Sequence, residues 1–247
     1  MTKQKGYMDR IYLITPTYAS NKEIWEIAGI EEMDIFEPKK TVLHNLKKLI
    51  EQERQEWDDF LRKKELYKEY QRVINGQSLN LNDADIMQKL LTYHELGFLD
   101  SPPTWKYKKE VPPRLGVIID DCLGSELFLP TAKLTSFCCN HRHHGNGLGI
   151  SVWMLVQSYC CKEGIAKPIR EQCTALLLFK LVQEKNLQRI WEESDVPIKY
   201  EDFKKMCVDV HKEPHAFLFI DFAFKRPEHR FRHNLDKFLT YQEQELI

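Results

Sequence analysis

The sequence predicts an α/β fold: a mostly parallel sheet flanked by helices, with a helical insertion at about residues 38–113. Most of the strand-like segments are continuous apolar runs, which are typical of parallel strands buried on both faces, and segments with helical periodicity separate these runs. The chain has 247 residues, 43% hydrophobic and 30% charged, which suits one large α/β domain or two small ones. We expect a single domain over residues 1–247.

The first half of the chain is predicted to hold one strand and the helical insertion. Residues 10–17 form a short buried strand that ends at a proline turn. This strand is either a sheet edge or an internal strand whose preceding neighbour is missing. In residues 39–74 apolar side chains recur every three or four positions among Glu and Lys, which predicts a solvated amphipathic helix or helical pair. A second helix over residues 82–96 and a proline-rich connector over residues 101–113 follow.

The second half alternates between apolar runs and amphipathic segments. We expect every strand here to join the same mostly parallel sheet. The predicted strands are residues 116–121, 149–157, 175–180 and 216–224, and the predicted helices are residues 131–144, 186–193, 200–210 and 235–244.

Charge and cysteine content limit the classes of protein. The net charge of −1 gives no global basic field for nucleic acid, so a polyanion would need a local patch such as residues 225–234, where cations alternate with an aromatic ring. The seven cysteines, mostly beside apolar runs, predict reduced buried thiols in a cytosol-like compartment. No apolar run reaches about 18 residues, so no membrane span is predicted. The first residues lack the apolar core of a signal peptide.

Two adjacent carboxylates, Asp120 and Asp121, end the predicted strand at residues 116–121. Parallel α/β sheets bind ligands at the carboxyl ends of their strands. We expect one carboxylate there to hold Mg²⁺ and its neighbour to polarise the water that attacks a γ-phosphate. The alternative is an ordinary acidic turn in which Asp121 caps the following segment.

Three further polar residues have positions that suit phosphate chemistry. Gln157 ends the next predicted strand and is suited to sensing a γ-phosphate or orienting water; the alternative is a turn residue that satisfies backbone groups. Arg142 precedes that strand and is suited to neutralising a transferring phosphoryl group from a neighbouring subunit; the alternative is a surface arginine. Arg170 is either a phosphate or subunit contact or an ordinary salt-bridge partner.

A group of potential zinc ligands precedes residue 149. The ligands are too crowded in sequence for a tetrahedral site, and no second Cys-x-x-Cys pair is present. We therefore do not predict zinc. The residues are Cys138, Cys139, His141, His143 and His144.

The strand with its two acids is typical of the Mg²⁺-binding half of a P-loop ATPase site. No Gly-x-x-x-x-Gly-Lys-[Ser/Thr] loop precedes it in the sequence. Since that loop cradles the phosphates, we expect this chain alone to bind Mg²⁺ and ATP weakly and to be inactive alone. A split or truncated gene, a misassigned start and a degenerate copy all remain open.

Six motifs occur in one order along the chain. They are Ile11-Tyr-Leu-Ile-Thr-Pro-Thr-Tyr18, Val117-Ile-Ile-Asp-Asp-Cys122, His141-Arg-His143, Val156-Gln-Ser-Tyr159, Lys167-Pro-Ile-Arg170 and Gln172-Cys-Thr174. Over about residues 6–245 the series resembles the genome-packaging ATPases of nucleocytoplasmic large DNA viruses, the poxvirus-type packaging family of the FtsK–HerA superfamily.

The resemblance implies a P-loop NTPase-like core whose first strand and P-loop are missing. It also implies a homo-oligomeric ring that hydrolyses ATP to move double-stranded DNA into capsids, with capsid or inner-membrane virion proteins as further partners. The place of action would be the host cytoplasm, in a viral factory, or the virion. By motif match Asp120 resembles the Mg²⁺ ligand, Asp121 the water-activating carboxylate, Gln157 the sensor and Arg142 an arginine acting in trans.

Two other hypotheses remain beside a motor ATPase. The first is a non-catalytic ring or scaffold subunit with a degenerate ATPase fold. The second is an unrelated nucleic-acid-binding or metal-binding module whose Asp-Asp strand is coincidental.

Overall fold

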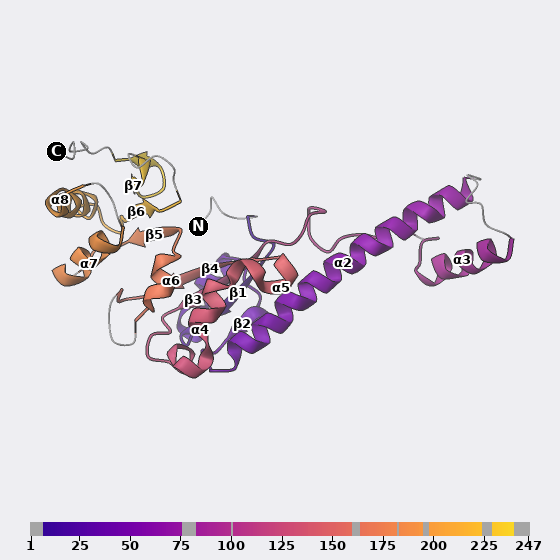
Figure 1. The fold of residues 1–247 in the computed structure, drawn as a ribbon, viewed down its shortest axis with the longest axis horizontal. Coiled ribbons are helices and arrows are strands. Elements are labelled where there is room, and N and C mark those ends of the chain that lie inside the picture. Colours follow the sequence, from indigo (N-terminus) through magenta and orange to yellow (C-terminus); the bar gives the residue numbers. More distant parts are fainter. Residues whose placement is uncertain are drawn as a thin grey trace. The chain divides into compact units, whose positions relative to one another are not determined.

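The structure, a computed structural model, describes residues 7–75, 83–99, 101–159, 164–181, 183–194, 198–223 and 229–239 (Figure 1). Its contacts divide the chain into two compact units. The first unit holds the described residues up to Ala132 together with Asn140–Leu155, and the second holds Lys133–Cys139 and the described residues from Val156 onward.

The first unit contains a four-stranded sheet in which every neighbouring pair is parallel. The strand order is β2-β1-β3-β4, so β1 and β3 are central and β2 and β4 are edges. The predicted parallel α/β architecture is therefore confirmed for this part of the chain. The strands are β1 (Arg10–Ile14), β2 (Ile35–Phe36), β3 (Leu115–Asp120) and β4 (Ile150–Leu155).

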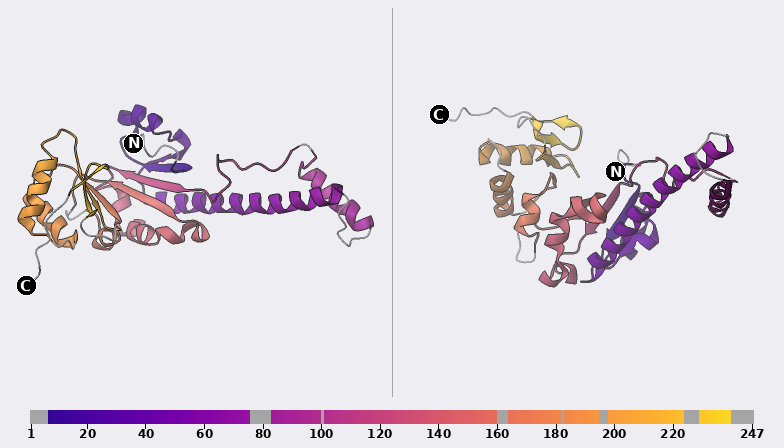
Figure 2. Two further views of the ribbon diagram at one scale, coloured as in Figure 1. Left: turned by 90° about the horizontal axis from the view of Figure 1, so that it is seen from above. Right: turned by 45° about the vertical axis from the view of Figure 1, so that its right-hand side comes forward.

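Helices cover both faces of this sheet. On one face Leu13 and Ile118 pack against Trp25 of α1 (Tyr18–Ile27). On the other face Arg10 bonds to Glu53 of α2 (Val42–Ile74). The left view of Figure 2 shows α1 and α2 on opposite sides of the strands.

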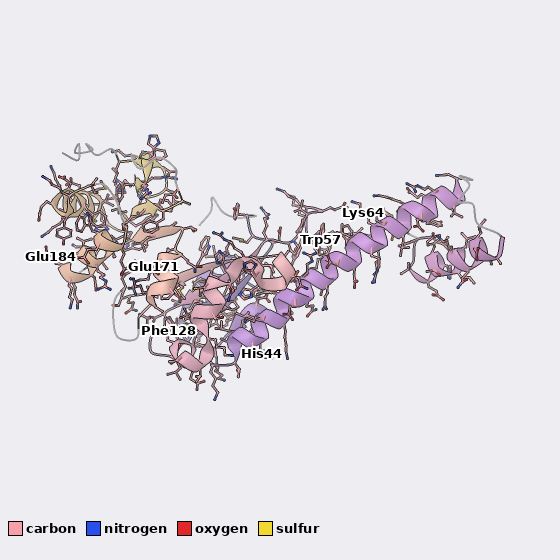
Figure 3. The ribbon with its side chains drawn as sticks, in the orientation of Figure 1. His44, Trp57, Lys64, Phe128, Glu171 and Glu184 are labelled. Atoms are coloured by element: carbon pink, nitrogen blue, oxygen red, sulfur yellow. The ribbon has the colours of Figure 1, made fainter. Side chains whose placement is uncertain are left out.

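The helical insertion is confirmed as one 33-residue helix, α2, followed by α3 (Asp83–Glu95). Figure 1 shows α2 running away from the sheet with α3 beside its far end. There Tyr70 of α2 contacts Tyr93 and Phe98 in a buried aromatic cluster. Figure 3 labels Trp57 in the middle of α2. The centroid of its ring lies 5.0 Å from that of Trp105 in the connector.

Short segments connect β3 to β4, and the single helix predicted over residues 131–144 is wrong. Lys133 has φ 60°, and Gly145 and Asn146 also have positive φ, so regular helix is interrupted at both ends of this region. Gly145 approaches Ile50 of α2 so closely that a Cβ there would lie 3.0 Å from its side chain. The segments are η2 (Glu32–Asp34, before β2), η3 (Glu126–Phe128), η4 (Pro130–Ala132), α4 (Leu134–Cys139), η5 (His141–His143) and α5 (His144–Gly147).

The second unit is built on an antiparallel sheet. Its strand order is β5-β6-β7-β8, and its core includes Phe203, Leu218, Ile220 and Phe231, all at 0% exposure. The elements are α6 (Lys167–Glu171), β5 (Ala175–Leu178), α7 (Glu184–Ser194), α8 (Tyr200–Val210), β6 (Leu218–Asp221), β7 (Phe231–His233) and β8 (Lys237–Phe238).

Two predictions for the second half are therefore wrong. The strands predicted at residues 175–180 and 216–224 form, but they pair antiparallel with each other and not within a parallel sheet. The helix predicted over residues 235–244 is replaced, in its described part, by a turn and β8. Asn234 has φ 53°, as a turn residue can, and its side chain accepts a hydrogen bond from the N–H of Phe217, which fixes the turn after β7 to the start of β6. Residues 240–244 lie outside the described residues.

Candidate functional site

The candidate site lies at the carboxyl edge of the parallel sheet, where β1 and β3 end side by side. The hydroxyl of Thr15, directly after β1, donates to Oδ2 of Asp120 at 3.2 Å. Thr15 is 2% exposed, and its Oγ1 lies 3.1 Å from Oγ1 of Thr17. The edge therefore presents one carboxylate and two hydroxyls from two neighbouring strands, all of them oxygen ligands of the kind that Mg²⁺ accepts.

Asp121 continues this edge in a different backbone conformation. Its N–H donates to the carbonyl of Leu155 at 3.2 Å, which extends the β3–β4 ladder by one step. Its φ is 51°, in the left-handed region that aspartate tolerates better than most residues. The side chain is exposed. The chain thus turns immediately after Asp120, and Asp121 lies next to Asp120 at the solvent boundary of the edge.

Cys122 anchors the turn after the two acids. Its thiol is 1% exposed and donates to the carbonyls of Asp120 at 3.1 Å and Ile14 at 3.4 Å. Burial, with the nearby carboxylates, raises the pKa of this thiol to about 12, so the group is a neutral donor and not a nucleophile at neutral pH. The thiol therefore ties the end of β3 to the end of β1.

Partial burial raises the pKa of Asp120, and the negative charge of Asp121 adds to the rise, while the Thr15 hydrogen bond opposes it. A bound divalent cation would favour the charged carboxylate and lower this pKa again. Keeping Asp120 charged at this position thus costs free energy when no cation is bound, as is common for metal-binding carboxylates.

Thr15→Val should raise the pKa of Asp120 further, because it removes the hydrogen bond that stabilises the carboxylate and leaves burial unopposed. The measurement is a pH titration of the Asp120 carboxyl carbon by NMR. Thr41→Val is the matched control, since Thr41 lies at the start of α2 and not at the strand ends. An unchanged Asp120 titration in Thr15→Val would show that the hydroxyl does not bond the carboxylate in solution.

The structure places Arg142 at the amino ends of the strands, on the side of the sheet opposite to the carboxyl ends where Asp120 lies. Its carbonyl oxygen lies 3.5 Å from the position of a Cβ on Gly149, just before β4. The start of β4 pairs with Leu115, whereas Asp120 pairs with Leu155 at its end. Five steps of a strand span about 16 Å, so one chain does not bring Arg142 and Asp120 together.

Gln157 and Arg170 belong to the second unit. Gln157 is exposed two residues after β4. Arg170 is almost buried and forms an ion pair with Glu193, in which Nε and Nη2 each donate at 2.8 Å. It also donates to the carbonyl of Ile165. The salt-bridge alternative for Arg170 is therefore confirmed, and its role as a phosphate contact stays a prediction.

The basic segment at residues 225–234 is described only from His229 onward. Within that part, Arg232 donates to Asp221 at 3.0 Å and lies over the ring of Phe238 at 4.8 Å. This guanidinium therefore links three neighbouring strands of the antiparallel sheet, β6, β7 and β8. The rest of the segment lies outside the described residues.

Two findings concern metals and membranes. Within the described ranges no group of three or more His, Cys, Asp or Glu side chains is arranged to hold a metal ion. A cation at Asp120 and Asp121 would therefore complete its shell with water and ligand oxygens, as Mg²⁺ commonly does with nucleotides. In the described part of the chain no helix combines the length and apolar character needed to cross a bilayer.

Comparison with known proteins identifies no relative: no family model, no curated protein and no solved structure matches this chain. The carboxyl edge of the parallel sheet is therefore the feature from which a function is inferred. Sequence reasoning missed Thr15 and Thr17 as site residues. Their signal was their place directly after an apolar strand, the same signal that identified Asp120.

Proposed function

We propose that this chain is the C-terminal part of a DNA-packaging motor that couples ATP hydrolysis to movement of double-stranded DNA into capsids. In this proposal Asp120 binds Mg²⁺ and Asp121 polarises the attacking water. The observation that supports it is the Asp120–Asp121 pair at the carboxyl end of a central strand in an all-parallel sheet, where Asp120 accepts a hydrogen bond from Thr15, directly after the neighbouring strand. The order of motifs along the chain supports the choice of packaging motors within the nucleotide hydrolases.

The chemistry assigned to these residues is limited to the metal and water side of the reaction. Mg²⁺, when bound, would neutralise charge on the phosphate oxygens. Asp120 would hold the cation in place, with the Thr15 hydroxyl fixing the orientation of the carboxylate. Asp121, exposed at the boundary, would accept a hydrogen bond from the attacking water. The phosphate-binding loop would have to come from a segment outside this sequence.

A non-catalytic ring or scaffold subunit is the second candidate. It is favoured by the engagement of Arg170 with Glu193 and by the position of Arg142 at the far edge of the sheet. Arg170 thus already has an acidic partner in Glu193, and a single chain does not bring Arg142 to Asp120.

Iron-directed cleavage tests the metal site in the chain as it exists. Fe²⁺ substitutes for Mg²⁺ and, with ascorbate and peroxide, cuts the backbone close to where it binds, so even weak sites are detected. We expect cuts near residues 15 and 120, an increase when ATP is added, and loss of most of the cleavage in Asp120→Asn. Asp209→Asn is the matched control, because Asp209 is an exposed carboxylate paired with Lys212 in the second unit.

Uniform cleavage, or cleavage unaffected by Asp120→Asn, would refute the metal site. An increase of this cleavage with ATP would favour the motor over the scaffold candidate, because a purely structural cation would not respond to nucleotide.

A further inference from the structure

The edge strand β4 lacks the features that normally keep a strand edge from pairing. Among the described residues it lies at the end of the strand order, so one row of its backbone N–H and C=O groups faces away from the sheet. None of its six residues is charged, and no charge occurs from Leu148 to Tyr159. Trp153 and Leu155 are 39% and 40% exposed. Proteins usually protect such edges with lysine, proline or a bulge.

The hydrogen-bond pattern identifies the groups that face outward. The carbonyl of Leu155 accepts from Asp121 and therefore points toward β3. Because successive residues of a strand point their backbone groups in opposite directions, Trp153 and Ser151 also face β3. Ile150, Val152 and Met154 consequently direct their N–H and C=O groups to the open side.

We propose that a second copy of this chain pairs with β4 through its own β4, antiparallel and centred on Val152. A two-fold axis requires the two identical strands to run in opposite directions, and it then sets Val152 opposite Val152 of the second copy. Ile150 lies opposite Met154. Each of these opposed pairs exchanges N–H···O bonds from its outward groups. The two parallel sheets become one continuous sheet.

The side chains of β4 are complementary to themselves in this register. On the face that bears the exposed residues, Trp153 lies opposite Ser151 of the second copy, and Leu155 lies opposite Gly149. Large side chains thus lie opposite small ones, and the exposed indole of Trp153 becomes buried against the second copy. On the other face Ile150, Val152 and Met154 meet one another. No like charges are opposed, since the strand carries none.

The pairing has a consequence for Arg142. The start of β4 in the second copy lies beside the end of β4 in the first copy. Gly149 of the second copy is therefore opposite Leu155 of the first, which pairs with Asp120 of its own chain. Two strand spacings put that Gly149 about 10 Å from Asp120. Since the backbone of Arg142 contacts Gly149, the second copy brings its arginine to the edge that a single chain's arginine does not reach. This consequence rests on the proposed function, whereas the pairing of the strands does not.

Sedimentation and cysteine cross-linking test the pairing in the absence of nucleotide. The native chain should dimerise, and Val152→Pro should raise the dimer dissociation constant at least about tenfold, because it removes an outward donor while leaving the bonds to β3 intact. Leu177→Pro is the matched control. Leu177 is an exposed residue of β5, an edge strand of the antiparallel sheet, whose outward amide the proposal leaves unpaired.

Cross-linking tests the register. Directly opposed residues of a hydrogen-bonded pair have Cα atoms about 5.5 Å apart, within disulfide range, so Val152→Cys should form a disulfide-linked dimer on mild oxidation. Trp153→Cys should not, because its counterpart is displaced by two positions and lies about 8 Å away. The native chain supplies the background from its own thiols, and circular dichroism verifies that each variant is folded.

A native chain that remains monomeric at all concentrations would overturn the proposal. So would a dimer that survives Val152→Pro but not Leu177→Pro, or equal cross-linking of the two cysteine variants. None of these results would bear on the metal site, which the iron cleavage tests separately.

Discussion

Arg10→Met should lower the free energy of unfolding of the first unit by about 3–5 kcal/mol, because it leaves two buried carboxylates without their cation. Arg10 contacts Asp34 through Nε and Nη2, the closest approach being 2.7 Å, and donates through Nη1 to Glu53 at 2.7 Å. The two acid side chains are 4% and 1% exposed. These bonds, with Asp34 the strongest partner, raise the pKa of Arg10, so the guanidinium stays charged at every accessible pH.

The network joins parts of the chain that are distant in sequence. Glu53 of α2 also accepts from Lys106 at 2.8 Å and from the hydroxyl of Tyr107 at 3.1 Å, both in the connector that precedes β3. Removing Arg10 therefore disturbs β1, η2, α2 and the connector together, and the remaining Lys106 compensates only one of the two carboxylates.

Denaturant unfolding followed by circular dichroism measures this effect. Arg54→Met is the matched control. Arg54 lies on α2 and is also in an ion pair, but its partner Asp58 is 50% exposed and four residues away on the same helix. Such pairs contribute about 0.3–0.5 kcal/mol. If Arg10→Met costs no more than Arg54→Met, the buried network does not stabilise the fold as described.

Glu193→Gln should destabilise the second unit by about 2–3 kcal/mol at neutral pH, and the difference from the native chain should disappear in strong acid. The Arg170 guanidinium, with Arg189 and the Tyr159 hydroxyl, lowers the pKa of Glu193 from 4.5 to about 2, against the opposing effect of partial burial. A lowered pKa in the folded state stabilises the fold above the unfolded pKa, and this stability is lost as pH falls from about 4.5 to about 2. Glu193 is 17% exposed and Arg170 9%, so solvent screens the pair only in part.

Unfolding by denaturant between pH 7 and pH 2 measures the difference. Glu184→Gln serves as the control, since Glu184 pairs with Lys204 at the exposed start of α7 and should change stability little (Figure 3). A Glu193→Gln penalty that stays constant down to pH 2 would mean that the charge of Glu193 is not its source.

The sheet of the first unit could be predicted where strands are long apolar runs. β1, β3 and β4 satisfy this condition; β1 and β4 lie within the predicted ranges, and β3 begins one residue before its predicted range. β2, β7 and β8 have two or three residues each, too few for any periodicity to appear. In the second unit Ala175–Leu178 is as apolar as a buried parallel strand, yet it is an edge with Leu177 46% exposed. Composition alone does not distinguish these two cases.

The site could be predicted in part for the same physical reason. Asp120 was identified because residues that follow a parallel strand lie at its carboxyl edge. The same rule places a residue before a strand at the other edge, and so it predicts the position found for Arg142. The partner of Arg170 could not be predicted, because Glu193 lies 23 positions away on another helix. Only the folded chain brings these two side chains together.

The length of α2 has a mechanical consequence. Its 33 residues form a rod about 50 Å long, fixed to the sheet at one end by Leu46 and Ile50, both at 0% exposure. From Ile50 to Ile74 the helix extends about 36 Å, so a tilt of about 10° at Ile50 would move the far end by roughly 6 Å. A partner bound at the aromatic far end of α2 would therefore use the helix as a lever, and the force on the strands would be larger than the force applied at that end.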